Sequence, residues 1–382
     1  MDIVNIIRWL RRPPVVVGVL VAAVAASLAA GEFLVRSRER NRDDVPSSTP
    51  SAFYRHRQLG IALVRNLDYY GWFHVNSHGF RGPEVALHKP PGELRIMVVG
   101  GSTTFDTQVS ADSMTWPARL GHWLRVLHPD VPLQVINAGV PGYMVVDNTI
   151  RLHTELFAFE PDIIVLYHGH NDVSCALADR AGRRTRQGDR PNAMPTATPW
   201  GQWLQHHSEL YNKLVARWRA TVRRWAGRRV VASAPPPVDP ADEPFLCGVQ
   251  QFERDVTSFL AVARALGIHV IVTPVVHVSG PDITSEPDST IARRWWGARP
   301  YAEPDSALTL YRAYGRVLEQ ASEQEGATYI GTAQFGVQGQ ALFARRDPMH
   351  FNDEGADLMG RQLAQAISDL GIVTGGAGAL PR

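Results

Sequence analysis

The sequence predicts an α/β fold in three layers (α/β/α), with helices on both sides of a parallel sheet and an N-terminal membrane segment ahead of it. Short apolar runs of a strand's length alternate with longer segments of helical periodicity, which is the pattern of a doubly wound sheet. Gly, Ser or Asn residues follow several of these runs, at the position where open α/β sheets bind ligands. The chain has 382 residues, of which 45% are hydrophobic, so it is long enough to bury one or two full cores.

Five runs have the length and the β-branched composition of buried strands: 94–99, 133–137, 162–167, 269–273 and 328–330. Helical patterns are expected at 116–124, 252–266 and 308–325, and a final helix opens after Asn352. Because strands and helices alternate, we expect a flavodoxin-like fold with a five-stranded parallel sheet.

The expected organisation begins with a membrane segment and ends in one large domain. We expect a signal anchor or signal peptide in 1–36, a polar linker in 37–51, an extension packed on the main domain in 52–93, and the main domain in 94–382. Two stretches break its α/β rhythm and are interpreted as insertions, at about 176–244 and 278–305.

The apolar run at 15–30 is shorter than the about 20 residues that a spanning helix needs. A signal anchor and a cleaved signal peptide both fit, since small residues at 27–29 permit cleavage; a buried helix of the globular domain is the third possibility. Arginines at 8, 11 and 12 precede the run and arginines at 36, 38, 40 and 42 follow it, so the positive-inside rule is close to a tie. We expect the following domain to be translocated.

Net charge and cysteine content bear on binding to nucleic acid, on disulfide formation and on metal binding. The formal net charge is +2, which indicates no general affinity for nucleic acid. Cys175 and Cys247 form either one disulfide in an oxidising compartment or two independent buried thiols. No cluster has the spacing of a zinc site, and we expect no metal and no cofactor.

Ser102 is the candidate nucleophile, because it follows the first strand after two glycines, which allow a sharp turn and close approach of a ligand. The segment has neither a G-x-S-x-G elbow nor a phosphate-binding loop motif. A turn that merely caps a helix is the alternative.

Asp347 and His350 lie three residues apart, so that one loop can bring a base and its orienting carboxylate to a serine. A capped turn with a surface histidine is the alternative for that pair.

An ester-cleaving serine also needs hydrogen-bond donors for the oxyanion. Gly142 follows the second strand and offers a backbone amide, and Asn171 follows the third strand and offers a side-chain amide. The Ser102 amide is the third candidate. Taken singly, the glycine is a turn residue and the asparagine a loop residue.

Together, these four blocks resemble the SGNH (GDSL-like) hydrolase superfamily, which is named for Ser, Gly, Asn and His in this order. Ser102, Gly142, Asn171 and His350 match block by block, and Asp347 stands at the family's D-x-x-H aspartate. The resemblance extends from about residue 95 to the C-terminus, with insertions. It implies a five-stranded parallel sheet and a serine esterase with these residues as its site.

Two departures define a subgroup. Gly101 replaces the aspartate of the family's Gly-Asp-Ser, as in many members with Gly-Gly-Ser. The segment 76–82 (Asn-Ser-His-Gly-Phe-Arg-Gly) resembles a lead-in found in bacterial membrane-anchored SGNH proteins, and Asp106 stands where that subgroup more often has glycine.

The insertions are rich in arginine, tryptophan and proline. Leu214, Trp218 and Val222 fall on one face at helical spacing, which fits a helix on an anionic membrane surface or a lid helix that packs its aromatics on the core. The run Arg293-Arg294-Trp295-Trp296 suits sugar faces and anionic groups, or simply packs a loop.

The function expected from the sequence is a serine esterase that removes an acetyl or other short acyl group from a glycan or lipid. An O-acyltransferase with the same residues and a non-catalytic glycan-binding protein are the alternatives. A phosphodiesterase is disfavoured by the lack of metal ligands. The expected location is a bacterial inner membrane, single-pass with the catalytic domain in the periplasm, or secretion after signal cleavage.

Overall fold

We describe the protein from a computed structural model. The structure describes residues 13–40, 52–69, 72–180, 200–201, 203–204, 208–227, 247–278, 295, 304–332, 335–336, 339–345 and 347–373. The chain divides into two compact units, which are treated separately: residues 1–51 with 196–230, and residues 52–195 with 231–382.

The larger unit is built on a five-stranded parallel sheet with the order β6-β5-β7-β8-β9. Its strands are β5 (Leu94–Gly100), β6 (Leu133–Asn137), β7 (Ile163–His168), β8 (His269–Pro274) and β9 (Thr328–Tyr329). Counted within this sheet, the order is 2-1-3-4-5, which is the flavodoxin-like arrangement. The predicted fold class is confirmed, and each expected strand lies within about two residues of its predicted bounds.

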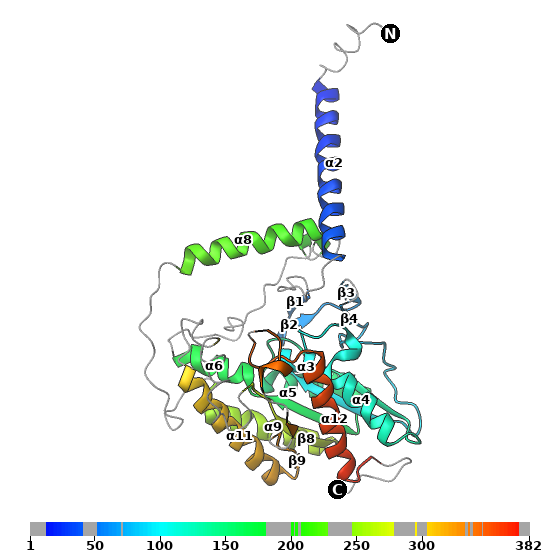
Figure 1. The fold of residues 1–382 in the computed structure, drawn as a ribbon, viewed down its shortest axis with the longest axis vertical. Helices are drawn as coiled ribbons and strands as arrows, with labels where there is room; N and C mark the ends of the chain where they lie inside the picture. Colours follow the sequence, from blue (N-terminus) through cyan, green and yellow to red (C-terminus); the bar gives the residue numbers. More distant parts are fainter. Residues whose placement is uncertain are drawn as a thin grey trace. The chain divides into compact units, whose positions relative to one another are not determined.

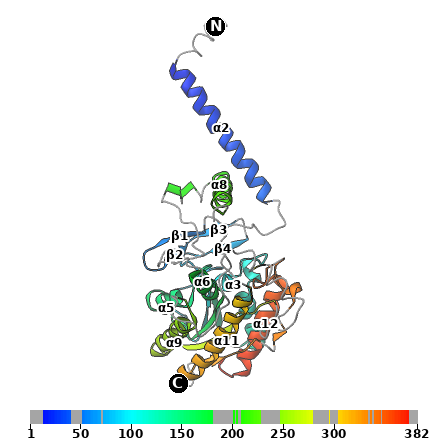
Figure 2. The same ribbon diagram turned by 90° about the vertical axis from the view of Figure 1, so that its left-hand side faces the viewer.

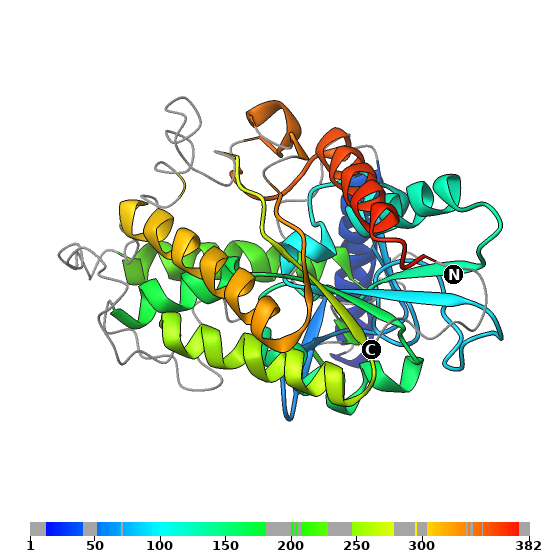
Figure 3. The same ribbon diagram turned by 90° about the horizontal axis from the view of Figure 1, so that it is seen from below.

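Side chains of one strand alternate between two apolar cores, one on each face of the sheet. Met97 and Val99 point into the core that is covered by α5 (Val145–Thr154), α6 (His170–Arg180), α9 (Val249–Ala265) and α11 (Pro304–Glu325). Ile96 and Val98 point into the core that is covered by α4 (Trp116–Leu127) and α12 (Asp353–Asp369). Figure 3 shows these two helical layers on opposite sides of the sheet. Because both faces are covered, the central strands are apolar without alternation in the sequence.

Residues 52–93 add two antiparallel hairpins, which the sequence patterns did not predict. One consists of β1 (Phe53–His56) and β2 (Gly60–Leu63), and the other of β3 (Leu67–Tyr69) and β4 (Phe73–Val75). A third apolar core joins these hairpins to Phe105, Val140 and Tyr143, which come from the segments that follow β5 and β6. The extension therefore packs on the same loops that carry the candidate site.

The smaller unit consists mainly of α2 (Pro13–Arg40) and α8 (Glu209–Gly227), which contact each other (Figure 1). The segment Pro13–Arg38 is long and apolar enough to cross a membrane, and a signal sequence near an N-terminus has the same properties. Helix α2 continues through Arg40 into the stretch expected to be a linker, because its arginines and glutamate are good helix formers. The rest of that linker, 41–51, lies outside the described residues.

The insertions are described only in part. Helix α6 runs to Arg180, across the expected start of the first insertion at about residue 176. Within it, α8 and residues 200–201, 203–204 and 208 are described. Within the second, residues 278, 295 and 304–305 are described, so three members of the Arg-Arg-Trp-Trp run lie outside the described residues.

Candidate active site

The predicted site residues come from loops at the carboxyl edge of the sheet and from the loop before α12. Ser102 follows the end of β5 and begins the short helix α3 (Ser102–Phe105). Asn171 lies in the first turn of α6, directly after β7, and Gly142 lies in the loop between β6 and α5. Strand order places β5 between β6 and β7, so these three loops are neighbours. Ligand sites of open α/β sheets lie at this edge.

Ser102, His350 and Asp347 form one chain of hydrogen bonds. His350 Nε2 lies 2.9 Å from Ser102 Oγ, and His350 Nδ1 lies 2.9 Å from Asp347 Oδ2. A carboxylate can only accept, so Nδ1 carries the proton and Nε2 of the neutral ring presents its lone pair to the serine hydroxyl. This is the tautomer that a general base needs.

Both carboxylate oxygens of Asp347 accept hydrogen bonds. Its Oδ1 accepts the backbone amides of Met349 (3.0 Å) and His350 (3.1 Å), which fixes the carboxylate while Oδ2 accepts the imidazole. Burial by itself raises the pKa of Asp347, but the neighbouring His350 and these hydrogen bonds together lower the pKa to about 2. Asp347 is therefore ionised at every pH at which the protein would be assayed.

The Asn171 side chain is fixed against the turn that leads into Ser102. Its Nδ2 donates to Tyr143 O at 2.9 Å. A Cβ added to Gly101 would lie 2.5 Å from the same nitrogen and 3.3 Å from Tyr143 O, so only glycine allows the amide to approach the backbone beside Ser102. Asn171 and the Gly142–Tyr143 turn thus lie beside the serine.

Backbone donors complete this side of the site. Within the part of the chain that the structure describes, the amides of Ser102 and Gly142 donate no hydrogen bond. Gly142 has a φ of +88°, a conformation that glycine adopts without strain. The turn is tied to β5 because Val140 N donates to Gly100 O at 3.0 Å. Gly139 lets it approach α3, since a Cβ there would lie 2.3 Å from Phe105 N.

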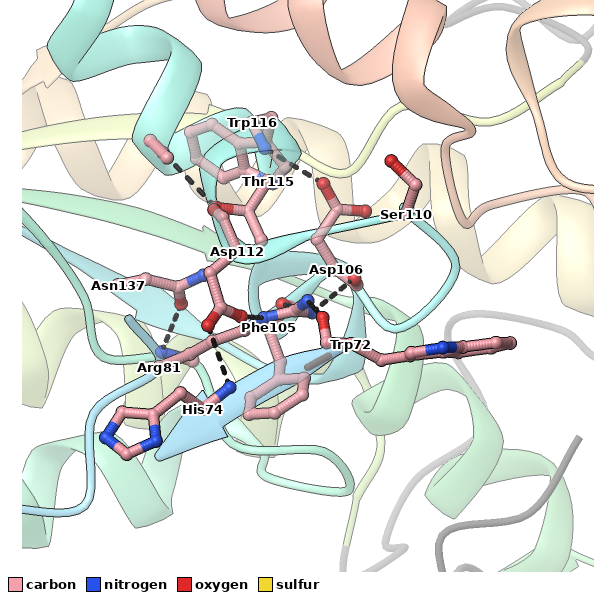
Figure 4. A network of polar contacts seen from close by, with 12 residues as sticks. Trp72, His74, Arg81, Phe105, Asp106, Ser110, Asp112, Thr115, Trp116 and Asn137 are labelled. Atoms are coloured by element: carbon pink, nitrogen blue, oxygen red, sulfur yellow. Dashed lines mark hydrogen bonds and ion pairs between the residues drawn. The ribbon is translucent and has the colours of Figure 1, made fainter. Parts of the chain in front are cut away.

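Arg81 of the N-terminal extension braces helix α3, which begins at Ser102, and no sequence motif indicated this contact (Figure 4). Its Nη1 donates to the backbone carbonyls of Phe105 (2.9 Å) and Asp106 (2.7 Å), at the end of α3. Its Nε pairs with Asp112 at 2.6 Å, and its Nη2 donates to Trp72 O at 3.2 Å. The Arg81 side chain is only 2% exposed, so the carbonyls depend on it in place of water.

The turn around Asn76 positions this arginine. Asn76 Oδ1 accepts the amides of His78 and Phe80, both at 3.0 Å, and Asn76 Nδ2 donates to Pro83 O at 2.9 Å. The 76–82 segment, singled out in the sequence only by resemblance, is therefore a side-chain-stabilised turn that delivers Arg81 to α3. Its asparagine was the available signal, since Asn stabilises turns through its own side chain.

Asp106 is a buried carboxyl at the end of α3. Its φ of +66° is left-handed, a conformation that is uncommon for residues other than glycine. Its Oδ2 accepts the Trp116 amide at 2.9 Å, at the start of α4, whereas its Oδ1 has no hydrogen-bond partner in the described structure. Burial raises the pKa of Asp106 to about 7, against the opposing effects of the Trp116 amide and of the nearby charges of Arg81 and His350.

A group of rings adjoins the site on the α6 side. His170 Nδ1 contacts the hydroxyl of Tyr311, and the His170 ring meets Trp295 edge-on with centroids 5.3 Å apart. His277 packs on Tyr311 at 5.5 Å, and its neighbour Val278 donates to Pro348 O at 2.7 Å, in the loop that carries His350. Trp295 belongs to the Arg-Arg-Trp-Trp run that the sequence singles out, whereas the other three rings, His170, His277 and Tyr311, come from three separate segments that no motif indicated.

Cys175 and Cys247 form a disulfide. The sequence left open one disulfide or two independent thiols, and the structure has the disulfide. Cys175 lies one turn after Asn171 in α6. Among the described residues, no group of three or more His, Cys, Asp or Glu side chains is arranged to hold a metal ion.

This fold and this grouping of serine, histidine and amide donors define a serine ester hydrolase of the SGNH class. The chain belongs to the GDSL-like lipase/acylhydrolase family, whose model matches residues 98–358. The resemblance seen in the sequence is thereby confirmed. No curated protein matches the chain.

The solved structures to which the chain is similar are distant. An acetylxylan esterase from Geobacillus stearothermophilus is 16% identical, with a TM-score of 0.43, over 72% of this chain and 94% of that one. An α/β hydrolase from the metagenome of Lake Arreo, Spain, is 15% identical, with a TM-score of 0.41, over 72% and 96%. A GDSL-like lipase from Bacteroides thetaiotaomicron is 14% identical, with a TM-score of 0.39, over 72% and 88%. At these scores the likeness says nothing about the substrate.

Proposed function

We propose that Ser102, His350 and Asp347 form the catalytic triad of this esterase. The observation that carries the proposal is the pair of 2.9 Å contacts that joins the three side chains through His350. Ser102 Oγ attacks the ester carbonyl while its proton passes to His350 Nε2. The resulting imidazolium is stabilised by the ionised Asp347 and returns the proton to the leaving alcohol. Water then attacks the acyl-serine by the same route, which releases the acid.

The oxyanion is held by the backbone amides of Ser102 and Gly142 and by the Asn171 side chain. Support comes from the two backbone amides that donate no hydrogen bond in the described structure, and from the fixed Asn171 amide beside Gly101. Donors of this kind are worth about 3–4 kcal/mol each when removed singly.

The proposed substrate is an acetyl or other short acyl ester of a glycan or lipid. The rings of His170, Trp295 and Tyr311 support a glycan, because they lie next to the Asn171 loop and combine apolar faces with hydrogen-bonding edges. Such side chains suit the apolar face and the hydroxyls of a sugar ring.

The proposed location is a bacterial inner membrane, with α2 as a single span and the catalytic domain in the periplasm. The disulfide supports this, since disulfides persist in oxidising compartments and are rare in the cytosol.

The test is hydrolysis of p-nitrophenyl acetate and butyrate by the full chain in detergent. Ser102→Ala should lower kcat by a factor on the order of 10⁶. Ser258→Ala, an exposed serine on α9, is the matched control and should retain the parent rate. Equal rates in all three proteins would refute the triad. Lack of turnover with a stable acyl-enzyme, seen as a mass increase on the intact chain, would indicate an acyltransferase that awaits its acceptor. Lack of both would indicate a binding protein.

A further inference from the structure

Glu32 joins the two helices of the smaller unit. It lies near the end of the apolar run of α2, and its carboxylate accepts the first backbone amides of α8, from Glu209 (2.8 Å) and Leu210 (3.0 Å). It also accepts the hydroxyl of Ser208 at 2.8 Å and pairs with Arg36 at 2.6 Å. The carboxylate therefore caps the start of α8 from another helix, where a negative charge is favourable.

Close packing accompanies this cap. A Cβ added to Gly31 would lie 3.1 Å from Leu210 Cδ2, so the glycine brings the two helices together just where the apolar run ends. Figures 1 and 2 both show α8 running across the direction of α2. A helix that runs across a membrane-spanning helix, starting where its apolar part ends, lies along the membrane surface.

The exposed surface of α8 has the composition of an interfacial helix. Leu214 and Trp218 are four residues apart, on one face, and they are 56% and 70% exposed. Arg217 is exposed and lies about 100° around the helix from Trp218. The α8 sequence contains one lysine and four arginines against one glutamate. Tryptophan, leucine and arginine so distributed favour the boundary between acyl chains and anionic headgroups.

We propose that α2 is retained as a membrane anchor and that α8 lies in the interface of the same bilayer, with Leu214 and Trp218 among the acyl chains and its basic residues on anionic headgroups. The proposal rests on the proposed membrane location and not on the triad. The Glu32 cap favours retention, because cleavage at 27–29 would leave Glu32 within a few residues of a new N-terminus, where chain ends are poorly ordered. Helix α8 would then fix the orientation of the chain as it leaves the membrane.

The test measures depth in the bilayer. The full chain is reconstituted in vesicles of phosphatidylcholine and phosphatidylglycerol, with a nitroxide on one introduced cysteine: Leu214→Cys, Trp218→Cys or Arg217→Cys. The native cysteines are protected by their disulfide. At 214 and 218 the ratio of relaxation by oxygen to relaxation by an aqueous nickel chelate should exceed that at 217 several-fold. The ratio at 218 should fall when phosphatidylglycerol is omitted.

Three results would overturn the proposal. Equal ratios at the three positions would place α8 in water. Low accessibility to both reagents at 214 and 218 would mean that protein covers this face, either a second copy or the rest of the chain. An intact mass of the membrane-bound protein that lacks the residues before 30 would show cleavage. Esterase activity measured on the same samples separates these failures from a failure of the proposed triad.

The variant Glu32→Ala tests independently whether the cap positions α8. Loss of the cap should lower the depth ratio at 218 while the protein stays in the membrane fraction. The matched control is Glu253→Ala on the exposed side of α9, which should leave the ratio at 218 unchanged. An unchanged ratio in Glu32→Ala would show that Glu32 does not position α8.

Discussion

Arg81 and Asp106 lie in contact without forming an ion pair. The guanidinium of Arg81 donates to the backbone carbonyl of Asp106 at 2.7 Å and gives its charge to Asp112 at 2.6 Å. The Asp106 carboxyl is left buried with one oxygen unpartnered in the described structure. Helix α3 is thus held at its backbone by a cation from the N-terminal extension, and it ends at a buried carboxyl with no ion-pair partner among the described residues.

Removing the guanidinium should loosen α3. Arg81→Met leaves buried carbonyls and Asp112 without their donor, so we expect a loss of about 3–5 kcal/mol in the free energy of unfolding and a lower kcat. The measurement is urea unfolding followed by tryptophan fluorescence. Arg264→Met is the control, because this arginine is 63% exposed and pairs with Glu325 at the surface, where such pairs are worth about 1 kcal/mol or less. Similar losses in both variants would contradict the bracing role.

Asp106 should make stability depend on pH in a defined direction. Its pKa is raised from an ordinary 3.8 to about 7, so between these values the unfolded chain is ionised while the folded protein keeps the proton. Folding is therefore penalised progressively as pH rises through this window, and the penalty is complete above about pH 7. Asp106→Asn removes the titration, so its Tm relative to the parent should be higher at pH 8 than at pH 4.

The comparison uses thermal unfolding of both proteins at pH 4, 6 and 8. A Tm difference that stays constant across this range would mean that Asp106 does not titrate in the folded protein. Arg81, His350, Asp353 and Tyr167 are the titratable groups that sense this carboxyl, and they are unchanged in the variant.

Gly101 should be needed for catalysis. In Gly101→Ala the new methyl would lie 2.5 Å from Asn171 Nδ2, so the amide has to move away from the serine. Loss of one oxyanion donor lowers kcat by about 10²–10³-fold, and we expect this range for the variant. Gly315→Ala in α11 is the control, because nothing lies within 4 Å of the added Cβ, and it should keep full activity. Parent-like hydrolysis by Gly101→Ala would argue against Asn171 as a donor.

The disulfide should stabilise the larger unit. Cys175 and Cys247 are 72 residues apart, so the bond closes a long loop, and disulfides typically contribute about 2–4 kcal/mol. Addition of dithiothreitol should therefore lower the Tm of the parent protein. A Cys175→Ser/Cys247→Ser double variant should start at the lower Tm and should not respond to the reductant. Equal Tm values with and without reductant in the parent would show that the bond adds nothing to stability.

Much of the fold and the candidate site follows from local sequence. The strands were visible because a buried parallel strand must be a continuous apolar run, and β5 and β7 are buried along their whole length. Ser102, Gly142 and Asn171 were visible because polar or glycine residues after such runs have to lie at one edge of the sheet. His350 was found through its three-residue spacing from Asp347, which is again a local pattern.

Tertiary structure decided what no local pattern contains. The sequence determined a five-stranded α/β domain of a serine ester hydrolase and an apolar helix before it, and it named a candidate serine, candidate amide donors and a candidate Asp-His pair. Arg81 reaching α3, the burial of Asp106, the pairing of Cys175 with Cys247 and the capping of α8 by Glu32 each join segments that are distant in sequence. The local sequence around an arginine is the same whether its side chain lies in water or against the end of a helix. The environment of such a side chain depends on the packing of separate elements, because burial and hydrogen-bond partners exist only after the chain has folded.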